Sequence, residues 1–131
     1  MLTPCDPREI ALLDLAHYYG LTVYQADLPA GVRGRYYQAA HKILICRDLD
    51  SVQRVCTLAH ELAHCMWGHD GAQSPEVEDM IEEEAARLLV PRHRFDEARE
   101  RVGDHTSDLA AALCVTPAIV AAWLRTIIRT P

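Results

Sequence analysis

The sequence feature that most constrains this chain is the segment His60-Glu61-Leu62-Ala63-His64. It lies within residues 51–67, which contain no proline and place apolar side chains at helical spacing. Histidines four positions apart on a helix project from the same face, so their imidazoles can bind one Zn²⁺ ion. The glutamate beside the first histidine can reach water at such an ion. The segment therefore predicts a zinc site on a long helix.

A zinc ion that keeps one position open for water usually has three protein ligands, so a third ligand is expected. Asp70 is one candidate, but that arrangement needs a sharp turn with glycine at position 67, where this chain has Trp67. A crossing helix offers better candidates, because it can present one carboxylate to the metal and a second acid one turn later to orient a histidine ligand. Glu78 and Glu82 have this spacing. The acidic side chains of the helix that follows are Glu76, Glu78, Glu82, Glu83 and Glu84.

The rest of the chain contains both helix and strand signals. Asp6-Pro7-Arg8-Glu9 predicts a helix start with Glu9 closing a capping box, and Gly20 predicts its end. Three short segments have strand signals: 21–24, 35–39 and 42–46. Four further helices are predicted near 75–90, 95–101, 107–113 and 117–129. We therefore expect one α+β domain over residues 1–131, in which a small three-stranded antiparallel sheet packs on the helix of residues 51–67 and a mainly helical half follows.

Composition limits the classes of protein to which the chain can belong. Apolar residues make up 50% of its 131 residues, enough for a folded core. The formal net charge of -6 argues against a general nucleic-acid binder. No apolar run approaches the roughly 18 residues that span a membrane, and the N-terminus lacks the features of a signal peptide. Because the five cysteines include no CxxC pair, we expect reduced thiols and a cytoplasmic protein without membrane partners.

Residues 106–131 resemble a helix-turn-helix pair in outline. The second helix begins Pro117-Ala118-Ile119-Val120-Ala121-Ala122-Trp123 and has almost no side chain that could contact a base edge or a phosphate before Arg125. We therefore interpret the pair as a packing or partner-binding element and do not expect direct nucleic-acid binding.

Three stretches of the chain point to the same family. They are Gly34-Arg35-Tyr36-Tyr37, the segment Thr57-Leu58-Ala59-His60-Glu61-Leu62-Ala63-His64 with Gly68-His69, and Ala85-Ala86-Arg87-Leu88-Leu89-Val90-Pro91. With these, the chain resembles the ImmA/IrrE family of zinc metallopeptidases. The resemblance implies a zinc ion bound by His60, His64 and a helical glutamate, with Glu61 as the general base.

The same resemblance suggests which glutamate is the third ligand. The family segment reads Glu-x-x-Ala-(Asn/Asp)-x-(Phe/Trp)-Ala, and aligning it without a gap to Ala85 places the ligand at Glu78 and the orienting acid at Glu82. Ile81 and Glu84 depart from that pattern. A rival alignment starts at Glu82 and loses the orienting acid, so we prefer Glu78.

Members of the family typically cleave a specific repressor and so release phage or mobile-element genes. The resemblance therefore implies a zinc-dependent endopeptidase of narrow specificity whose substrate is a transcriptional repressor, acting in the host cytoplasm if the chain is phage-encoded. The alternatives are a catalytically silent, metal-stabilised protein-binding module and a helix-turn-helix regulator. Hydrolysis also needs a hydrogen-bond donor for the developing oxyanion. Four residues are candidates for that donor: Tyr36, Tyr37, His69 and His93.

Overall fold

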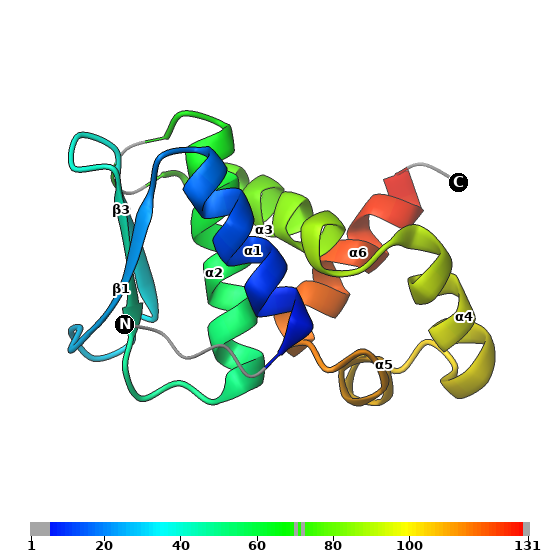
Figure 1. The fold of residues 1–131 in the computed structure, drawn as a ribbon. Coiled ribbons are helices and arrows are strands. Elements are labelled where there is room, and N and C mark those ends of the chain that lie inside the picture. The colour runs from blue at the N-terminus through cyan, green and yellow to red at the C-terminus, as the bar shows by residue number, and fades with distance from the viewer. Residues whose placement is uncertain (1–5, 70, 72, 130–131) are drawn as a thin grey trace.

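The computed structural model of this chain describes residues 6–69, 71 and 73–129 (Figure 1). Within these residues the chain forms a small sheet and a larger set of helices, which confirms the α+β class. In chain order the elements are α1 (Pro7–Tyr18), β1 (Thr22–Ala26), β2 (Gly34–Tyr37), β3 (Lys42–Cys46), α2 (Ser51–Met66), α3 (Pro75–Leu89), α4 (Arg92–Val102), α5 (Thr106–Leu113) and α6 (Pro117–Arg129).

Side-chain caps fix where the two helices of the candidate site begin. At the start of α2, the Asp50 carboxylate accepts the Gln53 backbone N–H at 2.8 Å, and the Gln53 side chain accepts the Asp50 backbone N–H at 3.2 Å. At the start of α3, the Ser74 hydroxyl accepts the Val77 backbone N–H at 3.3 Å, and Pro75 occupies the first turn. Both caps satisfy backbone donors that have no partner inside the helix.

The sheet has the strand order β1-β3-β2, with β1 parallel to β3 and β2 antiparallel to β3. The predicted all-antiparallel sheet is therefore wrong for one of its two pairings. The loop of residues 27–33 leads from β1 to β2, which are not neighbours in the sheet. β3, the last strand in the sequence, lies between them. Ile43 and Ile45 of β3 are fully buried, and a central position covers this most apolar strand on both edges.

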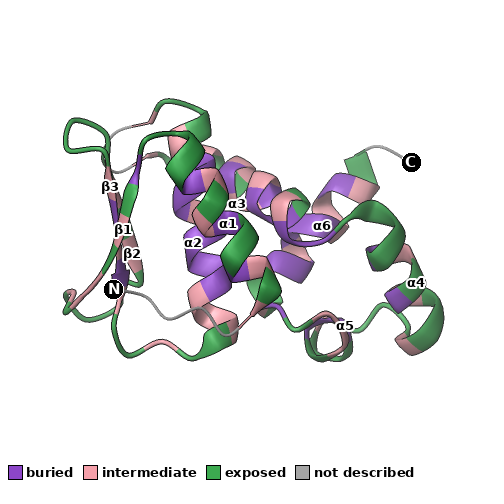
Figure 2. Ribbon diagram, viewed as in Figure 1, coloured by how far each residue is buried: buried purple, intermediate pink, exposed green. Residues whose placement is uncertain are grey.

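Helix α2 packs against β2 and β3 of the sheet and also against α1 and α3 (Figures 1 and 2). Leu58 and Leu62 are fully buried on this helix, and Ile81 and Ala85 are fully buried on α3. Because α2 packs against other elements on several sides, its register relative to both the sheet and α3 is tightly set.

Helix α6 packs on α3, and α5 packs on α4. Trp123 donates its indole N–H to the Ala86 carbonyl of α3 at 3.1 Å and stacks on Phe95 of α4, with ring centroids 5.3 Å apart. No single helix in the described part of the chain is long and apolar enough to cross a membrane, although α5 and α6, bent by 110°, meet the length and composition requirement as a pair.

Candidate metal centre

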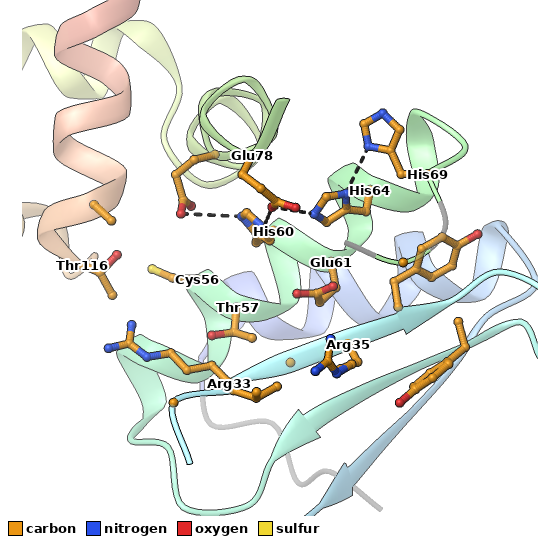
Figure 3. Close-up of a pocket in the computed structure, with 18 residues that line it drawn as sticks. Arg33, Arg35, Cys56, Thr57, His60, Glu61, His64, His69, Glu78 and Thr116 are labelled. Carbon is orange, nitrogen blue, oxygen red and sulfur yellow. Dashed lines mark hydrogen bonds and ion pairs between the residues drawn. The ribbon is translucent and has the colours of Figure 1, made fainter. Parts of the chain in front are cut away.

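Helices α2 and α3 bring together one donor atom from each of His60, His64 and Glu78, all within 4.8 Å of one another. The carboxylate oxygen Oε1 of Glu78 lies 3.0 Å from Nε2 of His60 and 2.9 Å from Nε2 of His64 (Figure 3). Both imidazole nitrogens therefore face the same carboxylate across the contact between the two helices. Within the described residues, this is the group of histidine, cysteine and acidic side chains that could hold a metal ion.

The distances from Glu78 to the two histidines are close to those expected around a tetrahedral ion. Ligand atoms about 2.0–2.1 Å from a tetrahedral zinc ion lie about 3.3 Å from one another. The two distances from Glu78 to the histidines are shorter than this by only a few tenths of an ångström. A small outward movement of the Glu78 carboxylate would bring both distances to that value. Two nitrogens and one oxygen are also a donor set typical of catalytic zinc.

Glu82, one turn after Glu78, lies on the other side of His60. Its Oε2 is 3.5 Å from Nδ1 of His60, within ion-pair distance but longer than a normal hydrogen bond. Burial of His60 opposes its protonation, but the contact and charge of Glu82, together with the charge of Glu61, outweigh it and raise the pKa of His60 to about 9. The carboxylates that favour a proton on this ring would equally favour a metal cation beside it.

Glu61 lies on the side of α2 that faces the sheet, beside β2. The residue is only 8% exposed, yet it lines the same cleft as the two histidines. Burial, opposed in part by the charge of His60, raises the pKa of Glu61 to about 7. Burial likewise lowers the pKa of His64, against the charge of Glu78. A buried carboxyl group that still reaches an open cleft is suited to exchange a proton with a bound molecule.

These side chains line a cleft of about 750 Å³. Its other walls include β2, the segment after α2 and the beginning of α6, and sequence reasoning did not assign most of these residues to the site. The β2 residues could have been assigned to the site because the predicted sheet packs on the helix that carries the histidines. No local sequence signal assigns the beginning of α6 to the site. The additional lining residues are Gly31, Val32, Arg33, Gly34, Arg35, Cys56, Thr57, Gly71, Thr116 and Ala118.

The structure separates the other candidate ligands. Glu83 is 3% exposed and pairs with Arg125 and Arg129 of α6, on the opposite side of α3 from the histidines. Glu84 pairs with Arg87 at 2.7 Å, and Glu76 is exposed. Asp70 lies outside the described residues.

The candidate oxyanion donors also divide into two groups. Tyr36, Tyr37 and His69 line the cleft, whereas His93 lies on α4 and is not among the lining residues. His69 has a second contact that sequence reasoning did not foresee: its Nδ1 is 3.1 Å from Nδ1 of His64.

A comparison with protein families matches residues 16–125 to the IrrE N-terminal-like domain, which is classed as a peptidase family. The match covers most of the chain and includes every residue of the candidate metal centre. The chain belongs to this family. Membership confirms the resemblance found in the sequence. The cleft therefore belongs to a peptidase-like domain with a possible metal site.

A comparison with solved structures shows the same fold in a Mycobacterium tuberculosis transcriptional regulator, with a TM-score of 0.65 and 22% sequence identity. The likeness covers 88% of this chain but only 40% of that chain, so the IrrE-like fold there is part of a longer protein. No curated protein matches the sequence.

Proposed function

We propose that this chain is a zinc-dependent endopeptidase of narrow specificity, and that its substrate is a regulatory protein such as a transcriptional repressor. The observation that carries the proposal is the grouping of two histidines and one glutamate beside a buried glutamate, in one open cleft of an IrrE-like fold. This is the arrangement expected of a peptidase that uses a metal and a carboxylate base together.

In this proposal His60, His64 and Glu78 hold the ion. A bound zinc ion supplies Lewis acidity toward a scissile carbonyl and toward water. The Glu61 carboxylate accepts the proton of the attacking water and later donates it to the leaving amine. Because Glu61 projects from the same helix one position after His60, its place relative to the ligands is fixed by the helix itself.

The cleft also suits an extended substrate. β2 lies at the edge of the sheet, since β3 pairs with it on one side only, and all its residues line the cleft. An extended peptide could add to that edge through backbone hydrogen bonds while its side chains contact the cleft walls. Narrow specificity follows if a substrate must have side chains that fill the cleft around Arg33 and Thr116.

The regulatory role of the substrate rests on support of a different kind. It rests on the family resemblance and on one structural neighbour with the same fold, which is a transcriptional regulator. A protein partner is therefore part of the proposal, whether the chain cleaves it or only binds it.

Zinc content and a Glu61→Gln variant test the proposal together. Wild-type protein and Glu61→Gln should each bind about one zinc ion per chain, because glutamine leaves the ligands unchanged. Glu61→Gln lacks the candidate base, so it should bind a protein partner without cutting it and can serve as bait. The wild-type protein should cut the same partner. Partner cleavage by wild type and not by Glu61→Gln supports the peptidase. Equal behaviour of the two proteins toward a bound partner would instead support a catalytically silent binding module.

A further inference from the structure

His69 contacts His64 because of how α2 ends. Trp67 is the C-cap of this helix, and Gly68 follows with a φ of +71°. The Gly68 backbone N–H donates to the Cys65 carbonyl at 3.0 Å, and the His69 N–H donates to the His64 carbonyl at 3.0 Å. These two bonds define a Schellman motif, in which the second residue after the cap lies over the third-last helical residue.

In most Schellman motifs those two positions make an apolar contact. Here they are His69 and His64, and their Nδ1 atoms lie 3.1 Å apart (Figure 3). A nitrogen–nitrogen hydrogen bond needs one N–H and one lone pair, so one ring must donate and the other must accept. The usual apolar contact is therefore replaced by a polar contact whose direction depends on where each ring carries its proton.

The opposite nitrogen of His64 decides that direction. Its Nε2 faces Glu78 at 2.9 Å, in the group of atoms that could hold a metal ion. An imidazole that binds a metal through Nε2 in its neutral form carries its proton on Nδ1. With a metal ion on its Nε2, His64 must donate through Nδ1, and His69 must accept through Nδ1 and carry its own proton on Nε2.

We infer that His69 is a positioning residue for the metal: its Nδ1 accepts the Nδ1–H of His64, which holds the His64 ring in the rotamer and tautomer that present Nε2 to the ion. The inference rests on the metal centre proposed above, but it does not depend on peptide cleavage. His64 is 6% exposed, so water is a poor substitute for this acceptor.

The chain allows a test that separates this role from helix capping. Asparagine carries Oδ1 where histidine carries Nδ1, so His69→Asn keeps an acceptor at the same place. His69→Leu removes the acceptor but supplies the apolar contact that Schellman motifs favour. His69→Gln keeps an amide but moves its oxygen one bond further along the side chain. His93→Leu, at an exposed position of α4, controls for the loss of a histidine elsewhere.

Zinc dissociation constants are measured by competition with a chromophoric chelator, and ring protonation is measured by ¹⁵N NMR of the zinc-loaded protein. We expect His69→Leu to bind zinc about 10- to 100-fold more weakly than wild type, with His69→Gln similar to it. His69→Asn and His93→Leu should stay close to wild type. Thermal unfolding in chelator should show His69→Leu at least as stable as wild type, and the spectra should place a proton on Nδ1 of His64.

Equal zinc affinity in His69→Leu and wild type would overturn the inference, as would equal losses in His69→Leu and His69→Asn. A wild-type protein that binds no zinc would overturn both this inference and the metal centre. A wild-type protein that binds zinc but cleaves nothing would contradict the peptidase alone, and the affinities of the four variants would still decide the role of His69.

Discussion

Gly34 packs so closely on Thr57, beside Glu61, that position 34 has no room for a side chain. A β-carbon on Gly34 would lie 3.2 Å from Cγ and 3.3 Å from Oε2 of Glu61, and 2.6 Å from Cγ2 of Thr57. The absence of a side chain at this one position lets β2 approach the helix that carries the candidate base. The distance between the edge strand and Glu61 is therefore set by a glycine.

Gly34→Ala should accordingly destabilise the fold, by about 1–3 kcal/mol, because the added methyl group overpacks a tight contact. Thr57→Ser removes the nearest obstructing atom, so Gly34→Ala should cost less in that background than in wild type. Urea unfolding of the two single variants and the double variant gives the comparison. An equal cost in both backgrounds would show that Thr57 is not the obstruction.

The candidate third ligand can be distinguished from its neighbour on the same helix. Glu78→Ala should remove most zinc binding. Among the described residues, Glu78 has the only carboxylate that faces both histidines, and this variant lacks it. Glu82→Ala should weaken binding about 10- to 100-fold, as expected of a group that orients a ligand. Zinc per chain is measured by plasma mass spectrometry after dialysis against a fixed free-zinc concentration.

Glu76→Ala, at an exposed position of the same helix, is the matched control and should bind zinc like wild type. Retention of zinc in Glu78→Ala with loss in Glu82→Ala would favour the rival alignment of the sequence.

Acid should weaken the attachment of α6 to α3. Burial of Glu83 opposes its ionisation, but hydrogen bonds from Arg129 and Arg125 outweigh it and hold the pKa of Glu83 below its ordinary value of 4.5. A carboxyl group whose pKa is lowered in the folded state contributes stability above its unfolded pKa and loses it as the pH falls through the folded value. Glu83→Gln should therefore be less stable than wild type at pH 7, and the difference should shrink toward pH 3. A constant difference across that range would contradict the role of the charge.

An ion pair between Glu9 and Arg54 joins α1 to α2. Glu9 is fully buried; its Oε2 accepts a hydrogen bond from Nη2 of Arg54 at 2.9 Å, and its Oε1 lies 2.8 Å from Nε of the same guanidinium. Arg54→Met should cost about 3–5 kcal/mol, because it leaves a buried carboxylate without this partner. The double variant Glu9→Leu/Arg54→Met should recover part of that loss in chemical denaturation. A double variant less stable than Arg54→Met alone would show that the pair itself, rather than the uncompensated charge, determines stability.

Local sequence signals predict those features of the molecule that depend on interactions between residues close in sequence, such as helix faces and helix starts. The helical spacing of His60 and His64 places both rings on one face, and Asp50 and Ser74 begin their helices as capping residues do. The pairing of β1 with β3 had no such signal, because strand order depends on which strand the core covers on both edges. Glu9 looked like a capping residue and instead points into the interior, where Arg54, distant in sequence, neutralises it.

The metal centre divides in the same way. The grouping of Glu78 with the histidines depends on how α2 and α3 cross, which spacing alone does not determine; its role as ligand stays a prediction. The contact of His69 with His64 was within reach of the sequence, since Gly68 after a helix is a frequent sign of a Schellman motif. Only the polar character of the contact is unusual for that motif.

The end of α2 has a consequence for how relatives of this chain can change length. Two backbone hydrogen bonds fix the spacing from His64 to His69, so a residue inserted or deleted between them would break the motif and move the second ring away from the first. The chain after His69 needs only to deliver α3 to its place. Insertions and deletions are therefore expected to accumulate between position 69 and the cap at Ser74, while the segment from His64 to His69 keeps a constant length.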